Sequence, residues 1–216
     1  MPFPANWLEE LVIEWLDLEG FVISTSVSVP AKAGGRLSPD VVGAKLDANG
    51  CLLIRHCEAA MYLVDNPEKV AERYSKKFSQ DIEKTVRDHF AKIFGPCISK
   101  QAKYEKWVIG IDMSKNVQNA LKEKEKIPGI QIHRLEDFIR KHVLPAIGKW
   151  QAPPNKNTTA IPADKWLLHM TDSFRYVGLI AGEKPGLIKP GGPDPGATKS
   201  KAAVTKTSPA KTGPKP

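Results

Sequence analysis

The sequence predicts a mixed α/β domain in which helices surround one sheet. Three observations lead to this class. Apolar residues recur at helical spacing in several segments, short runs of β-branched and aromatic residues lie between them, and Gly, Pro and Asn mark the boundaries. The expected order is one helix, three strands, then helix, strand, helix, strand and helix (αβββαβαβα), with a further helix near the C-terminus.

The first predicted helix spans residues 6–19. Asn6 is its N-cap, and Glu9 stands at the capping-box position three residues later. Gly20 ends the helix, in the position that a left-handed C-cap favours. Apolar side chains at helical spacing form one stripe along it: Trp7, Leu8, Leu11, Val12, Trp15 and Leu18.

Three strands follow, at residues 21–29, 37–46 and 51–58. Between the second and third, Asp47-Ala48-Asn49-Gly50 predicts a hairpin turn. Because side chains alternate between the two faces of a strand, His56 and Glu58 share a face and could meet Asp40 across the ladder.

A long helix is expected at residues 67–94, since Asn66-Pro67 opens it and Gly95-Pro96 closes it. The same criteria place the later elements: a strand at 107–111, a helix at 116–124, a strand at 130–133, a helix at 137–147 and a last helix at 163–176. This organisation divides the chain into a core at 1–147, a linker at 148–162, a C-terminal helical region at 163–183 that packs on the core, and a tail at 184–216.

The net charge of +8 belongs mostly to the tail. Residues 184–216 contain seven lysines and one acidic residue, so the remaining chain is close to neutral. The tail has too few large apolar residues to order itself. It either adds sequence-independent, salt-sensitive binding to nucleic-acid phosphates or serves as a solubilising extension.

Several classes of protein are excluded by what the sequence lacks. It has no run of 18 apolar residues, so no membrane span is expected. Cys51, Cys57 and Cys97 lack zinc-site spacing; Cys51 and Cys57 are expected to be buried thiols, and a reducing, cytoplasmic location fits them best. Nucleotide-binding loops and nucleophile motifs are also missing.

The Asp of Pro39-Asp40, the pair in His56-Cys57-Glu58 and the order of elements together resemble the PD-(D/E)xK nuclease superfamily, with its restriction-endonuclease-like fold. The archaeal Holliday-junction-resolvase-like branch is the most similar, over roughly residues 6–140. The resemblance implies endonuclease-like, Mg²⁺- or Mn²⁺-dependent hydrolysis of DNA by water, leaving a 5′-phosphate. It implies a metal cluster of Asp40, His56 and Glu58, with Glu9 contributing to catalysis from the first helix. Nucleases of this class often form homodimers.

The sequence departs from this family pattern at two positions. His56 stands where an acidic metal ligand is expected, and an imidazole favours softer ions than Mg²⁺. Glu58 stands where the family has its catalytic lysine, although a carboxylate there can orient a water molecule or bind a second metal. A lysine from the helix after the third strand, Lys76 or Lys77, could reach back, whereas Lys45 faces away from Asp40.

Each of these residues also has a purely structural explanation. Asp40 could begin a strand, His56 could be a satisfied core histidine, Glu58 could end its strand in solvent, and Glu9 could serve only the helix start. The basic residues of the long helix, Arg73, Lys76 and Lys77, either contact DNA or belong to a solvated face of paired charges. The alternative function is therefore an inactive nuclease-fold protein that binds nucleic acid or another protein.

Overall fold

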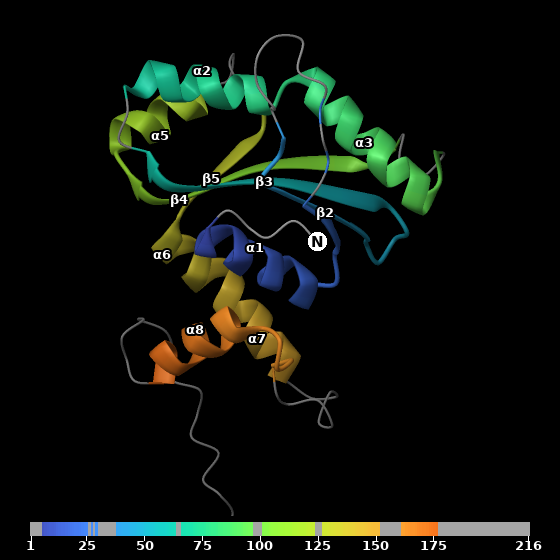
Figure 1. Ribbon diagram of the computed structural model, residues 1–216, viewed down its shortest axis with the longest axis vertical. Coiled ribbons are helices and arrows are strands. Elements are labelled where there is room, and N and C mark those ends of the chain that lie inside the picture. Colours follow the sequence, from blue (N-terminus) through green and yellow to red (C-terminus); the bar gives the residue numbers. More distant parts are fainter. Residues whose placement is uncertain are drawn as a thin grey trace, which may run out of the picture. The chain divides into compact units, whose positions relative to one another are not determined.

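A five-stranded mixed sheet in the order β1-β2-β3-β4-β5 organises the domain (Figure 1). The computed structural model describes residues 6–25, 27, 29, 38–63, 66–96, 101–123, 127–151 and 161–176. β1, β2 and β3 pair antiparallel, whereas β3, β4 and β5 pair parallel. The predicted α/β class is therefore confirmed. The strands are β1 (Val22–Ser24), β2 (Val41–Leu46), β3 (Leu52–Leu63), β4 (Lys103–Met113) and β5 (Ile130–Arg134).

The hairpin between β2 and β3 forms as predicted. The Asp47 carboxylate accepts hydrogen bonds from the backbone N–H groups of Asn49 and Cys51, at 2.8 and 2.9 Å. Gly50 has φ of +75°, a conformation in which a side chain would be strained. The turn sets the register Leu46↔Leu52, which continues to Val42↔His56. It thereby fixes which β3 side chains face each side of the sheet.

Helices cover both faces of the sheet (Figure 1). Cys57 and Ala59 of β3 belong to the apolar core on one face, together with α1. Ile54, two residues before His56, belongs to the core on the opposite face, together with α3. On the first face lie α1 (Trp7–Leu18), α6 (Leu135–Phe138), a π-helical turn η1 (Ile139–Val143) and α7 (Leu144–Gln151); on the second lie α2 (Pro67–Lys77), α3 (Gln80–Phe94) and α5 (Lys115–Lys122).

The single long helix expected at residues 67–94 is wrong: the structure has two helices, α2 and α3, with a break between them. Ser79 has an extended backbone, with φ of −62° and ψ of 159°. Phe78, which caps the C-terminus of α2, is buried, and its ring centroid lies 4.6 Å from that of His56. Burial of this aromatic ring against the sheet accompanies the change of direction, and helix propensity alone does not reveal it.

Near the C-terminal end of the described chain, α8 (Trp166–Tyr176) packs against α1. The carboxylate of Glu14, a buried residue of α1, accepts hydrogen bonds from the backbone N–H groups of Leu167 and Leu168, at 3.3 and 2.9 Å. These N–H groups lie in the first turn of α8, where the helix itself offers no acceptor. Glu14 thus ties α8 to the core.

Two expectations from the cysteines have different outcomes. Cys57 is fully buried as expected, whereas Cys51 is exposed because it follows the hairpin turn. The linker expected at 148–162 begins later, because residues 148–151 still belong to α7 (Leu144–Gln151). The middle of that segment, residues 152–160, lies outside the described residues, as do Cys97 and the tail at 184–216. Among the described helices, none combines the length and apolar character that crossing a bilayer requires.

Candidate functional site

Asp40 lies immediately before β2, at the point where that strand begins to pair with β3. Its Oδ2 accepts a hydrogen bond of 2.9 Å from the backbone N–H of Ala59 in β3. This bond fixes one carboxylate oxygen to the neighbouring strand and leaves Oδ1 directed elsewhere. The side chain is 21% exposed, so Asp40 lies at the margin of the core.

Glu58 lies within β3 and points to the face covered by α2 and α3. Its side chain has no exposed surface. A buried carboxylate without partners is very costly, so the identity of its neighbours decides what the residue does. Both of its oxygens have partners, and the two partners are different.

Lys77, the last residue of α2, joins the two acids. Its Nζ donates to Asp40 Oδ1 at 2.9 Å and also donates to Glu58 Oε2. The position at the C-terminus of a helix is favourable for an ammonium group, because the helix dipole is negative there. Asp40 and Glu58 therefore meet as the sequence predicts, and they meet at a lysine.

His56 lies behind this cluster and is completely buried. Its Nε2 is 2.8 Å from Glu58 Oε1, and its Nδ1 is 2.9 Å from the hydroxyl oxygen of Tyr104 in β4. His56 and Glu58 do share a face, as expected from strand alternation. However, both ring nitrogens have protein partners, so the imidazole supports Glu58 and has no nitrogen free to bind a metal ion.

The charges of the cluster shift the pKa values of its members. Burial, reinforced by the charge of Glu58, raises the pKa of Asp40 to about 6. Burial also raises the pKa of Glu58. Burial opposes the charge on Lys77, but the two carboxylates outweigh it and hold the pKa of Lys77 above its ordinary value. Burial and then the charge of Lys77 lower the pKa of His56 to about 3, so its ring is neutral.

With both acids ionised, two carboxylates and one ammonium leave a net charge of about −1 in a poorly solvated place. Such a cluster attracts a proton or a cation. The raised pKa of Asp40 shows this attraction for a proton.

The donor set fits one kind of metal ion better than others. Within the described parts of the chain, no group of three or more His, Cys, Asp and Glu residues is arranged to hold a metal. Asp40 and Glu58 instead offer two hard oxygen ligands. Mg²⁺ is commonly held by one or two carboxylates, with water molecules and substrate phosphates as its other ligands. The pair therefore suits Mg²⁺ or Mn²⁺, and it does not suit a closed zinc site.

The remaining predicted site residues lie elsewhere. Glu9 is in α1, on the other face of the sheet from Lys77, and its Oε1 accepts a hydrogen bond of 2.7 Å from Asn6 Nδ2. This contact matches the helix-start explanation. Arg73 and Lys76 are exposed on α2, where Lys76 pairs with Glu72 at 2.8 Å.

The sequence offers either Lys76 or Lys77 as the lysine near the site. The spacing of apolar residues in the helix distinguishes the two. Val70, Tyr74 and Lys77 are spaced by four and three residues, so they share one helix face. Val70 and Tyr74 are buried, which turns Lys77 toward the sheet and Lys76 toward solvent. The contribution of Tyr104 had no comparable signal, because it comes from a strand 48 residues beyond His56.

No protein-family model, curated protein or solved structure matches the chain.

Proposed function

We propose that this protein is a metal-dependent, endonuclease-like phosphodiesterase that hydrolyses DNA. One observation carries the proposal: Asp40, immediately before β2, and Glu58 of β3 direct one carboxylate oxygen each at the ammonium of Lys77. Two acids and a lysine at one point are the groups that a phosphodiester-hydrolysing site of the PD-(D/E)xK type requires.

The geometry supports a revised correspondence with that family. If Glu58-Ala59-Ala60 takes the place of the third-strand motif, then Glu58 is the acidic metal ligand and Ala60 stands at the lysine position. Lys77 supplies the missing ammonium from α2. The departure at the acidic ligand then disappears, and His56 is no longer required as a ligand. The departure at the lysine position remains in the sequence, but Lys77 of α2 provides the ammonium group there.

Each side chain has a defined task in this proposal. Asp40 Oδ1 and Glu58 Oε2, which bond to Lys77 in the structure, would hold the cation, while the backbone N–H of Ala59 keeps Asp40 in place. A bound Mg²⁺ or Mn²⁺ supplies Lewis-acid polarisation of the phosphate and a more acidic water. The ammonium of Lys77, next to these carboxylate oxygens, would offset the negative charge of the phosphate. Water is the nucleophile.

DNA approaches from the exposed side of the cluster. The side chains of Asp40 and Lys77 are 21% and 22% exposed, whereas Glu58 is covered completely. Arg73 and Lys76, exposed on the same helix as Lys77, supply phosphate contacts that position the duplex.

The direct test is nicking of supercoiled plasmid and cleavage of duplex and branched DNA with Mg²⁺ or Mn²⁺. Asp40→Asn keeps an acceptor for the Ala59 N–H but removes the charge, so cleavage should be lost while the fold is retained. Asp112→Asn, an exposed acid on β4, is the matched control and should remain active. Cleavage that survives Asp40→Asn would rule out this site.

A second function is favoured by one observation. The ammonium of Lys77 already bonds to both carboxylates, which is also what a nucleic-acid-binding module without catalytic activity would need for stability. A melting temperature that Mn²⁺ and Mg²⁺ leave unchanged, together with retained DNA binding and absent cleavage, would support the module. A metal-dependent rise that Asp40→Asn abolishes would support the nuclease.

A further inference from the structure

The two oxygens of Glu58 are held by different partners. Oε1 lies 2.8 Å from Nε2 of His56, on the interior side, and Oε2 contacts Lys77, on the side of Asp40. The carboxylate therefore cannot turn freely, because each oxygen would lose its partner. Only Oε2 faces the place where Asp40 and Lys77 meet.

Tyr104, His56 and Glu58 form a chain of hydrogen bonds, called the relay below. The donors and acceptors available to each side chain assign its hydrogens. A carboxylate accepts, so Nε2 of His56 carries the hydrogen and donates it to Glu58 Oε1. Nδ1 then lacks a hydrogen and accepts one from the hydroxyl of Tyr104, 2.9 Å away. Every polar atom of Tyr104, His56 and Glu58 is satisfied by this one arrangement.

The surroundings make the relay rigid. The ring of Phe78 packs against His56, and Tyr104 projects from β4, whose pairing with β3 places it opposite Ile54. The guanidinium carbon of Arg87 lies 5.2 Å from the centre of the Tyr104 ring.

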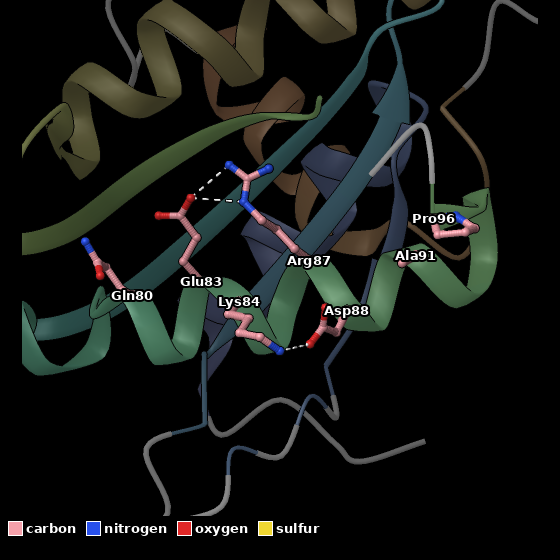
Figure 2. Close-up of a pocket in the computed structure, with 7 residues that line it drawn as sticks. All are labelled: Gln80, Glu83, Lys84, Arg87, Asp88, Ala91 and Pro96. Carbon is pink, nitrogen blue, oxygen red and sulfur yellow. Dashed lines mark hydrogen bonds and ion pairs between the residues drawn. The ribbon is translucent and has the colours of Figure 1, made fainter. Parts of the chain in front are cut away.

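Arg87 is itself anchored. Its Nε and Nη2 donate to one oxygen of Glu83, at 3.0 and 2.8 Å, and its Nη1 donates to the carbonyl of Ala102 at 2.8 Å. Figure 2 shows Glu83 and Arg87 paired along α3, while Lys84 and Asp88 pair separately on the same helix. They line an open hollow of about 520 Å³ whose charges are thus already matched to one another.

We propose that His56 and Tyr104 are positioning residues that limit Glu58 to one-oxygen coordination and so favour Mg²⁺ or Mn²⁺ over Ca²⁺. This inference rests on the proposed function of the site. Mg²⁺ takes six ligands at 2.0–2.1 Å, whereas Ca²⁺ takes six to eight at 2.3–2.6 Å and often binds both oxygens of a carboxylate. A carboxylate whose second oxygen is occupied by an imidazole is suited to the smaller ion.

A purely structural role for the relay makes a different prediction. If His56 and Tyr104 only satisfy buried polar groups, their replacement lowers stability and affects the binding of every metal ion equally. If they restrain Glu58, replacement changes the ratio of the affinities for Ca²⁺ and Mg²⁺. This ratio is independent of overall stability in a variant that remains folded.

The test is calorimetric titration of the full chain with MgCl₂, MnCl₂ and CaCl₂, without DNA. Tyr104→Phe keeps the ring and removes the hydroxyl donor, and His56→Leu removes the donor to Glu58. Loss of such a supporting partner weakens metal binding by about tenfold or more, and Mg²⁺ should lose more affinity than Ca²⁺. His56→Gln, which retains an N–H donor, should recover part of the selectivity. Tyr74→Phe, a buried tyrosine outside the relay, is the control.

The outcomes distinguish failure of the proposed metal-dependent function from failure of the proposed role of His56 and Tyr104. Wild-type protein that binds none of these ions overturns both the metal-dependent function and the relay. Wild-type protein that binds Mg²⁺, with an unchanged Ca²⁺ to Mg²⁺ ratio in folded Tyr104→Phe and His56→Leu, overturns the relay alone. A ratio that shifts toward Ca²⁺ in these variants and not in Tyr74→Phe supports it.

Discussion

Replacing Lys77 with methionine tests whether its ammonium compensates the buried carboxylates. At 2.9 Å and an effective dielectric constant near 20, one ammonium–carboxylate pair contributes about 6 kcal/mol of attraction before desolvation is considered. Removing one partner of a buried pair typically costs about 3–5 kcal/mol, because the other charge is left uncompensated. Since Glu58 is completely buried, Lys77→Met should lower the free energy of unfolding by an amount in this range near neutral pH.

The loss should depend on pH in a defined direction. Without the ammonium, the pKa values of Asp40 and Glu58 rise further above their values in the unfolded chain. The folded variant therefore binds protons more tightly than the unfolded one, so its stability falls as the pH rises through the folded-state pKa values. The gap between wild type and Lys77→Met should be large at about pH 8 and smaller at about pH 5.

Urea denaturation followed by tryptophan fluorescence measures both effects, since Trp15 and Trp107 are buried reporters. Lys76→Met is the matched control, because the side chain of Lys76 is exposed on the same helix and pairs with exposed Glu72. Equal unfolding free energies for the two variants at both pH values would refute the reasoning. In Lys77→Met, Mg²⁺ should also raise the melting temperature more than in wild type, because the ammonium no longer competes for the carboxylates.

Three further outcomes are expected. Asp40→Asn should flatten the pH dependence of wild-type stability between about pH 4 and pH 6. Burial raises the pKa of Asp40 to about 6, so protonation of Asp40 stabilises the folded state fully below about pH 4, and this stabilisation is lost as the pH rises through 6. The shift corresponds to about 3 kcal/mol. Comparing urea midpoints across this range measures it. Glu14→Ala should cost about 2 kcal/mol and expose α8 to proteolysis, because two backbone N–H groups lose a charged acceptor. Asn6→Ala should cost about 1 kcal/mol, measured by urea unfolding, because its side chain caps α1.

Local signals in the sequence predicted the elements that depend on neighbouring residues. The Asn6 cap and Gly20 define α1, and the turn after Asp47 fixes the register of the hairpin. This register is why Glu58 and Asp40 could be brought together from the sequence alone: alternation along a strand is a local property.

Features that depend on tertiary packing were not predictable in the same way. The break between α2 and α3 follows from burial of Phe78 against His56, and no glycine or proline marks it. The sequence predicts His56 as a metal ligand because the residue falls at the ligand position of the family motif and shares a strand face with Glu58. Its second partner, the Tyr104 hydroxyl, reaches it only when β4 pairs with β3.

The arrangement of the core also argues that the polar cluster has a function beyond stability. On the α2 and α3 face, the apolar core is divided into two clusters, one with Ile54 and one with Val108. Between them the inward positions of β3 carry His56 and Glu58. Buried ion pairs can often be replaced by apolar residues without loss, and such replacements stabilise some proteins by about 1–4 kcal/mol. Buried charged residues between two apolar clusters are therefore not explained by stability alone, and departures of this kind from an apolar core are typical of functional sites, in agreement with the function proposed above.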